Sequence, residues 1–324
     1  MFAWRGYDFF PHDLSFRFMR WKHVLVGASI VMGLISLALM YSPGLNFSID
    51  FKGGTLIEIQ NKNGPADLAA LRDKLNRLGL GDVLVQGFGN PSDALLRIAA
   101  QQSAEKAGGD KAQQAAVDKV KQALGDSVTY RRVESVGPTV SGELRQTGVI
   151  AVIASILAIA LYVWFRFEWQ FGVGGIVALL HDVLLTVGVF CILQLDFDIN
   201  VIGALLTIVG YSINDTVVVY DRIRENLRKF KKMPIEELID LSINETLSRT
   251  VLTSVTAFIA LLALYIFGPE VIRSFSFAML FGVVVGTYSS IFIASPILVY
   301  LGIKRDWLSG GVAAKPGGKA GSRA

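Results

Sequence analysis

Long apolar runs alternate with polar segments along this chain. Six runs carry almost no charge and are long enough to cross a bilayer, which takes about 20 helical residues. We expect membrane spans at residues 24–41, 146–165, 171–195, 199–220, 250–267 and 274–303. The pattern therefore predicts a polytopic α-helical membrane protein with six transmembrane helices.

The first run resembles a signal peptide because Arg17, Arg20 and Lys22 precede it. It is longer than the apolar core of a typical signal peptide, and no small-x-small cleavage pattern follows Tyr41. We interpret it as a retained membrane span.

The polar stretch 42–145, between the first two spans, is predicted to be a folded α+β domain. Alternating apolar positions indicate strands at 55–60, 83–88, 94–99 and 127–133, and helical spacing indicates helices at 67–78 and 111–124. A turn is expected at 89–93, and a short additional strand is expected at 46–51, before the first strand of the domain. This β-α-β-β-α-β order is the ferredoxin-like arrangement, which by itself does not define a function.

Basic residues predict the orientation, because Lys and Arg accumulate on the cytoplasmic side. They gather in segment 1–23, at Arg166, in the loop 221–247 and in the tail 304–324. We therefore expect both termini in the cytoplasm and the domain 42–145 on the opposite, exported side. Within the loop, Pro234 followed by two glutamates predicts a short surface helix, and the Gly-, Ala-, Lys- and Ser-rich tail is predicted to be disordered.

Composition agrees with this interpretation and excludes several classes. Charged residues make up 18% of the 324 residues, and the net charge of +4 follows from topology better than from nucleic-acid binding. The single Cys191 permits no disulfide within the chain and suggests no metal site. The glycines at 172, 174 and 175 lack the spacing of a nucleotide-binding loop, so we expect no cofactor.

One carboxylate stands out in the fourth span. Asp215 lies about 8 Å inside the expected membrane boundary, at roughly 1.5 Å per helical residue. An ionisable residue inside a membrane is costly, and it indicates a functional site by default. Arg249 lies at a matching depth at the start of the fifth span, so the two side chains can meet if these helices pack together.

Two interpretations of this pair remain open. Asp215 can take up and release a proton as Arg249 approaches or leaves, along facing polar stripes that include Tyr211, Ser212, Thr253 and Thr256. Alternatively, the pair is a static contact that fixes helix packing. His181 and Asp182, near the middle of the third span, are likewise candidates for a proton relay or for structural hydrogen bonds.

Glycines mark two further features. Gly53 and Gly54 follow Asp50 just after the first span, where they permit a turn or a close approach of backbones. Gly282 and Gly286 form a small-xxx-small face for helix packing in the sixth span, against a partner in this chain or another.

These motifs together resemble a known family. Asp50-Phe51-Lys52-Gly53-Gly54, His181-Asp182, the segment 210–226 and Ser248-Arg249-Thr250 are similar, in order and spacing, to the SecD/SecF family of protein-export membrane proteins. The resemblance covers about residues 10–305 and places the chain in the resistance-nodulation-division superfamily.

The resemblance implies a non-enzymatic role in the bacterial inner membrane. It implies pairing with SecD in a twelve-span unit beside the SecY-E-G translocon, with YajC and YidC as further candidate partners. It implies use of the proton motive force in late-stage translocation of exported polypeptides, with Asp215 as the proton-path acid and Arg249 as its partner. The alternatives are a small-molecule or lipid exporter of the same superfamily and a passive translocon scaffold.

Overall fold

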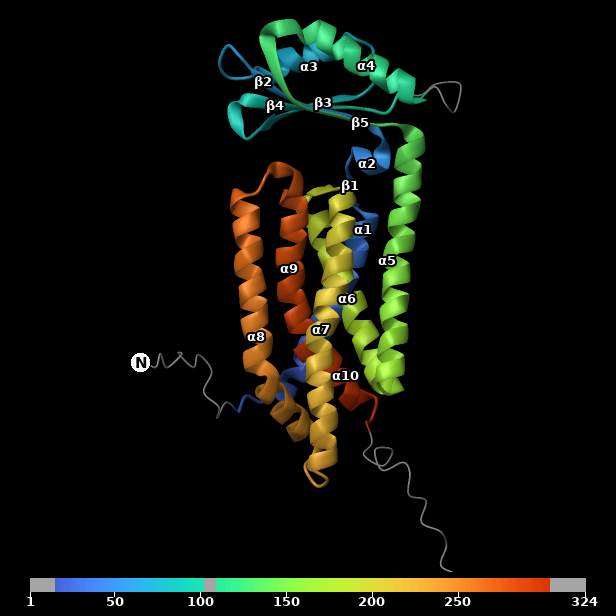
Figure 1. The fold of residues 1–324 in the computed structure, drawn as a ribbon, viewed down its shortest axis with the longest axis vertical. Helices are drawn as coiled ribbons and strands as arrows, with labels where there is room; N and C mark the ends of the chain where they lie inside the picture. Colours follow the sequence, from blue (N-terminus) through green and yellow to red (C-terminus); the bar gives the residue numbers. More distant parts are fainter. Residues whose placement is uncertain (1–14, 102–108, 304–324) are drawn as a thin grey trace, which may run out of the picture.

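A helical bundle carries a sheet domain at one end in the computed structural model, which describes residues 15–101 and 109–303 (Figure 1). Six of the described helices are long and apolar enough to span a membrane, which confirms the predicted class. They are Phe18–Tyr41, comprising the short turn η1 (Phe18–Trp21) and α1 (Lys22–Tyr41), then α5 (Pro138–Arg166), α6 (Trp169–Leu193), α7 (Ile199–Lys229), α8 (Ile235–Phe267), and Glu270–Tyr300, whose main part is α9 (Arg273–Ser289). The tail 304–324, predicted to be disordered, lies outside the described residues.

Three helices form the centre of the bundle. Half of the most apolar stretch of α6 and of α7, and 67% of that of the last span, are buried within the chain. The corresponding share is only 11% for α1, α5 and α8, so these helices present apolar faces outward.

Glycines set the close helix crossings at this centre. A Cβ added at Gly282 would lie 2.3 Å from Ile208 Cγ1, and one at Gly286 would lie 3.1 Å from Ser212 Cβ. The small-xxx-small face of α9 therefore packs on α7 of this same chain, which answers the question that the sequence left open.

The basic segment 221–247, expected as a loop, is mostly helical. Helix α7 continues to Lys229 and α8 begins at Ile235, so the connection is short, and the expected surface helix is the first part of α8. Apolar positions explain the extension: Leu227, Leu238 and Ile243 are buried against the main core beyond the expected ends of the spans.

The domain between the first two spans has the predicted element order. It contains β2 (Gly54–Asn61), α3 (Leu68–Asn76), β3 (Val83–Phe88), β4 (Asn90–Ile98), α4 (Gly109–Leu124) and β5 (Val128–Val136). The antiparallel sheet has strand order β3-β4-β2-β5, with Ile57 opposite both Leu96 and Val133. The ferredoxin-like label stays an interpretation of this order. The expected turn at 89–93 is tighter, because Phe88 already pairs with Asn90 around Gly89.

The two faces of the sheet have different surroundings. Helices α3 and α4 cover the face that points away from the bundle (Figure 1). Ile57, Ile59 and Leu96 point into this covered side and are fully buried with Leu75 and Val120 of the helices. The alternate residues line the opposite face, which is turned toward the bundle, as expected for a strand period of two.

The lead-in segment departs from the prediction of a strand at 46–51. The strand β1 (Asn46–Phe47) is only two residues long and pairs, in parallel, with β6 (Asp196–Phe197) between α6 and α7. The side chain of Ser48 then accepts a hydrogen bond from Asp50 N at 3.2 Å and begins the short helix α2 (Ile49–Lys52). A hydroxyl in this capping position favours a helical turn over an extended strand.

Gly53 and Gly54 connect α2 to the sheet in conformations that other residues rarely adopt. Their φ angles are 73° and 124°. A Cβ at Gly54 would lie 2.4 Å from the backbone oxygen of Ile98, so here the glycine serves a close approach of two strands.

We predict that Gly54→Ala lowers the free energy of unfolding by about 2–4 kcal/mol, because the strained φ and the clash with backbone add together. Gly64→Ala is the matched control: its φ is 108°, but an added Cβ meets no atom within 4 Å. Chemical denaturation of the purified full chain should show the larger loss for Gly54→Ala. Equal losses would show that the contact with Ile98 is relieved at no cost.

Candidate functional site

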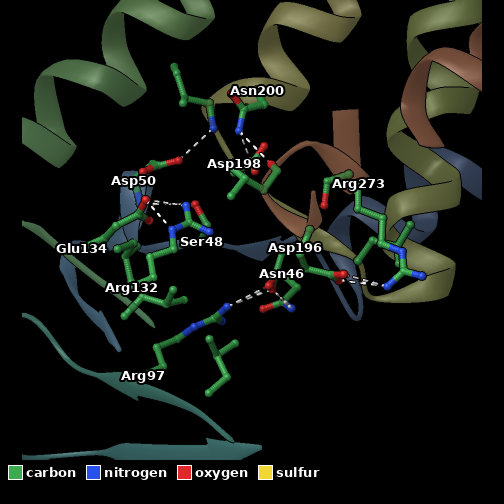
Figure 2. A pocket seen from close by; sticks show the side chains of 18 of the residues that line it. Asn46, Ser48, Asp50, Arg97, Arg132, Glu134, Asp196, Asp198, Asn200 and Arg273 are labelled. Carbon is green, nitrogen blue, oxygen red and sulfur yellow. Dashed lines mark hydrogen bonds and ion pairs between the residues drawn. The ribbon is translucent and has the colours of Figure 1, made fainter. Parts of the chain in front are cut away.

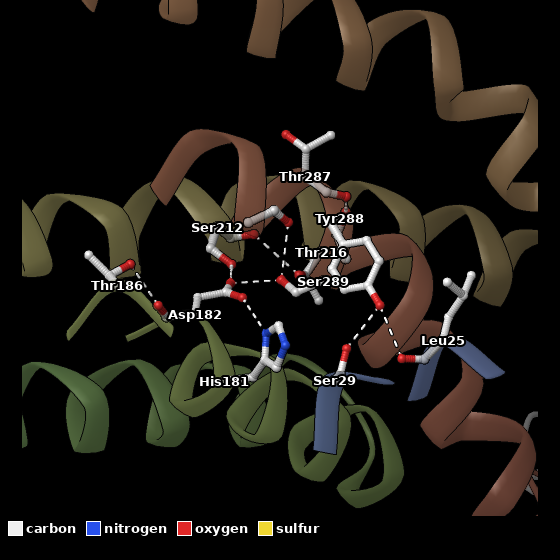
Figure 3. Close-up of polar contacts among 12 residues, drawn as sticks. Leu25, Ser29, His181, Asp182, Thr186, Ser212, Thr216, Thr287, Tyr288 and Ser289 are labelled. Atoms are coloured by element: carbon white, nitrogen blue, oxygen red, sulfur yellow. Dashed lines mark hydrogen bonds and ion pairs between the residues drawn. The ribbon is translucent and has the colours of Figure 1, made fainter. Parts of the chain in front are cut away.

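The carboxylate of Asp182 lies at the centre of a hydrogen-bond network that joins three helices (Figure 3). Its Oδ2 accepts from Ser212 Oγ of α7 at 2.5 Å and from Ser289 Oγ of α9 at 2.7 Å. Its Oδ1 lies 2.9 Å from Nδ1 of His181. With only 1% of Asp182 exposed, these three partners replace the water that the carboxylate loses on burial.

His181 extends this network toward the first span. Its ring lies 6.1 Å from that of Tyr288, whose hydroxyl contacts Ser29 Oγ at 2.9 Å and donates to Leu25 O at 3.1 Å. The Nε2 atom of His181 is buried and has no hydrogen-bond partner within the described chain. Structural hydrogen bonds were one of the two roles predicted for His181-Asp182, and Asp182 makes such bonds to α7 and α9, whereas His181 bonds Asp182 itself.

The last helix changes its winding directly after Ser289. Residues Ser290–Ala294 form a π-helical turn before α10 (Ser295–Tyr300). Such turns are rare and occur often at functional sites. The carbonyl of Ala294 accepts a hydrogen bond from the hydroxyl of the fully buried Tyr220 at 3.1 Å, so this turn is also joined to α7.

Asp215 lies one helical turn beyond Ser212 on α7, and its environment is less complete. The residue is 3% exposed, yet its Oδ2 has no hydrogen-bond partner in the described chain. Among the described residues, the hydroxyl oxygens of Tyr211 on α7 and Thr250 on α8 are also buried without hydrogen-bond partners. Polar atoms without partners are uncommon in a protein interior and call for an explanation.

Arg249 does not form an ion pair with Asp215 within the described part of the chain. Helices α7 and α8 do pack together, and the charge of Arg249 acts on the Asp215 carboxylate from beyond contact distance. Arg249, Thr253 and Thr256 are exposed on the surface of this chain, whereas the buried hydroxyls of α8 belong to Thr250 and Ser254. The expected pair therefore remains a hypothesis that needs a movement of one side chain.

The N-terminus of α7 is capped from two places in the sequence. Asp198 accepts from Val201 N at 2.9 Å, and Asp50 of α2 accepts from Ile199 N at 3.0 Å. Carboxylates are favourable at a helix N-terminus because the first N–H groups have no partner inside the helix. Burial raises the pKa of Asp198, and the charge of Asp50 adds to this rise, whereas the hydrogen bonds that Asp198 accepts from Val201 and Asn200 oppose it. The predicted motif residue Asp50 thus connects the sheet-side segment to α7.

A polar cleft of about 810 Å³ separates the open face of the sheet from the end of the bundle (Figure 2). Arg97 of β4 bridges it, with Nη2 at 3.0 Å from both carboxylate oxygens of Asp196 in β6. Asn46 also donates to Asp196 at 2.8 Å. Within the described residues, the sheet domain is joined to the bundle through α2 and α5, and the Arg97–Asp196 ion pair crosses the cleft.

The chemistry of this bundle is that of two acids with different surroundings. Asp182 has a complete set of partners, and Asp215 does not. Among the described residues no group of three or more His, Cys, Asp or Glu side chains could hold a metal ion. A buried carboxylate with a free oxygen is suited to take up and release a proton.

Sequence reasoning missed Ser289, Tyr288 and Ser29, which complete the network. The signal was present, since each is a polar residue inside an apolar run. What the sequence did not provide was the rotation of each helix, which decides whether a hydroxyl faces Asp182 or its own backbone.

The arrangement defines a class: a six-span membrane protein with an α+β domain between its first two spans and buried acids in the bundle. Residues 116–304 match the family described as protein export membrane protein SecD/SecF, C-terminal, and residues 38–60 match the SecD/SecF GG motif. The chain belongs to the SecD/SecF family of protein-export membrane proteins.

Named relatives agree over nearly the whole length. The chain is 48% identical over 306 residues to the protein translocase subunit SecF of Rhodobacter capsulatus, covering 91% of this chain and 92% of the relative. It is 47% identical over 288 residues to that of Rickettsia akari, covering 89% and 92%.

A solved structure shares the fold. The crystal structure of SecDF, a translocon-associated membrane protein from Thermus thermophilus, superposes with a TM-score of 0.78 at 36% identity. The match covers 90% of this chain and 39% of that longer chain. The six-span membrane fold and the SecD/SecF family are therefore confirmed.

We predict that Ser289→Ala lowers the free energy of unfolding by about 1–2 kcal/mol, because Asp182 loses a charge-assisted hydrogen bond in an apolar interior. Ser290→Ala is the matched control, since that hydroxyl bonds only to Thr287 O of the same helical segment at 2.9 Å. The free energy of unfolding of each purified variant, measured in detergent, is compared with that of the unchanged chain. A loss for Ser290→Ala as large as that for Ser289→Ala would contradict the importance of the network.

Proposed function

We propose that this chain couples the proton motive force to the late-stage translocation of exported polypeptides, through protonation of Asp215. The observation that carries the proposal is the buried Asp215 carboxylate, whose Oδ2 has no hydrogen-bond partner among the described residues, on the helix α7 that packs against α8. Membership of a family of protein-export membrane proteins supports the part of the proposal that concerns export. The role is one of transport, without bond-making catalysis.

In the proposed cycle, uptake of a proton removes the attraction between Asp215 and Arg249. Release of the proton restores that attraction and draws the exposed guanidinium toward the carboxylate. One charge moving across about 150 mV releases roughly 3.5 kcal/mol, which suffices to change a conformational equilibrium by a few hundredfold. Ser212 lies one turn from Asp215 and donates a hydrogen bond to Asp182 of α6, which also accepts one from Ser289 of α9. A shift of α7 would therefore displace or break contacts with both α6 and α9.

The route from the membrane to the sheet domain runs along α7. Its first N–H is bonded to Asp50, and Asp50 lies on the helix that leads to Gly53 and Gly54 at the base of the sheet. A shift of α7 therefore displaces α2 and the Gly53–Gly54 connection to the sheet. The Arg97–Asp196 ion pair across the cleft opposes a movement of the sheet domain away from the bundle. Opening and closing of this cleft is the proposed mechanical output on the exported polypeptide.

The proposed setting is the bacterial inner membrane, with both termini in the cytoplasm and the sheet domain in the periplasm. SecD is the proposed partner in a twelve-span unit beside SecY-E-G, with YajC and YidC as further candidates. The exposed faces of α1, α5 and α8 offer apolar surface for such a partner. Arg249 and its polar neighbours on α8 would then be covered by the partner's spans.

We predict that Asp215→Asn abolishes the gradient-dependent part of export while leaving the assembled protein at normal abundance, because an amide has the shape of the acid and cannot exchange a proton. Reporter export into inverted membrane vesicles, with and without a proton gradient, measures the effect. Asp73→Asn, which changes an exposed carboxylate of the sheet domain, is the control and should export normally.

The outcome separates the proposal from its alternatives. If export by Asp215→Asn still depends on the gradient, Asp215 is not the coupling acid. Either the chain is then a passive scaffold, or another group such as Asp182 carries the proton. Loss of assembly in the variant would instead assign Asp215 a structural role.

A further inference from the structure

A second charged pocket lies at the end of the bundle away from the sheet domain. It has a volume of about 510 Å³ between the end of α5 and the extension of α7. Four cationic and two acidic side chains line it: Arg166, Arg224, Arg228, Lys229, Asp221 and Glu225. The proposed proton site does not use any of them.

Two of these arginines are fixed in place. Arg166 Nη2 lies 3.1 Å from Asp221 Oδ1, and Arg224 Nη2 lies 3.1 Å from Glu168 Oε1. Both guanidinium groups also lie over the ring of Phe167, at 5.0 and 5.3 Å from its centroid. Side chains held in this way lose little conformational freedom when they bind an anion.

The remaining two cations, Arg228 and Lys229, have no carboxylate at contact distance among the described residues, and Lys229 lies over the Phe230 ring at 5.0 Å from its centroid. Glu225, one of the two acids of the pocket, forms an ion pair at 2.6 Å with Arg222, which does not line the pocket. Glu225 is therefore already engaged by a cation from outside the pocket. Neither Arg228 nor Lys229 forms an ion pair with any described carboxylate, and both are exposed. The Nε of Arg224 is buried without a hydrogen-bond partner. The pocket thus has more positive charge than its own acids can balance.

Aromatic side chains place the pocket at the level of lipid headgroups. Trp164, Phe165 and Trp169, which flank Arg166 in the sequence, are 69%, 89% and 55% exposed. Exposed tryptophans at the end of a membrane span are typical of the interface between hydrocarbon and water. Basic pockets between spans at this depth suit anionic headgroups, and arginine suits phosphate oxygens.

We propose that this pocket binds the phosphate of an anionic phospholipid headgroup. Arg228 and Lys229 contact the phosphate, and the Phe167 ring with its two arginines forms the fixed wall of the site. The acyl chains extend along the outward apolar face of α5. The lipid thereby anchors the end of α7 opposite to its Asp50 cap, and this binding does not depend on the proposed proton coupling.

Native mass spectrometry of the full chain tests the proposal with phosphatidylglycerol and phosphatidylcholine as probes. We expect tighter binding of phosphatidylglycerol, and we expect the double variant R228Q/K229Q to reduce that preference roughly tenfold, since each basic residue near the surface contributes appreciably to anionic-lipid attraction. K231Q/K232Q, which removes the same charge from the adjoining exposed turn, is the control and should keep the preference.

Three results would overturn the proposal. One is equal affinity for the two lipids, and another is an equal loss of preference in both double variants, which would indicate only general attraction to a basic surface. The third concerns the source of the phosphate: if inorganic phosphate displaces the lipid at equal concentration, the site recognises a soluble ion.

Discussion

The bundle depends on one constraint: a carboxylate buried among apolar helices must find its hydrogen bonds within the protein. Asp182 satisfies it with hydroxyls from α7 and α9 and with the neighbouring imidazole. Because each bond comes from a different element, the requirement fixes the relative rotation of the three central helices. The glycine contacts of α9 with α7 then allow the backbones to approach closely enough for Ser212 and Ser289 to reach the same oxygen.

Asp215 does not meet this constraint in full within the described residues. It lies on the same helix, one turn from a fully satisfied site, and still has an oxygen without a partner. Natural sequences depart from local consistency mostly at functional sites, where the cost is retained because it serves a change of state. The contrast between the two acids is therefore more informative than the burial of either one.

Much of the architecture follows from periodicity, and the exceptions have physical causes. Six apolar runs predicted the spans, and alternation predicted the four strands of the sheet, because both signals are local. The prediction of a loop at 221–247 was wrong. The segment is amphipathic: its many charged residues lie on one face of the helices, and the leucines and isoleucines of the other face pack against the core. The strand at 46–51 was shortened by the capping of Ser48.

The candidate site was predicted only in part, because contact partners depend on helix rotation. Asp182, Asp215 and Gly282 could be identified from residue type within an apolar run. The exposed position of Arg249 and the participation of Ser289 could not, since both depend on which face each helix turns inward. Gly188 was also missed: a Cβ there would lie 2.1 Å from Ser36 Oγ, so it sets the contact of α1 with α6.

The cap that Asp50 provides for α7 also has a consequence for biosynthesis. Its acceptor and donor are 149 residues apart, so the first N–H of α7 meets its carboxylate only after the sheet domain and two further spans have been synthesised. The contact between α2 and α7 is therefore among the last in this part of the bundle that can form during synthesis. It closes a loop that contains the whole sheet domain and the second and third spans.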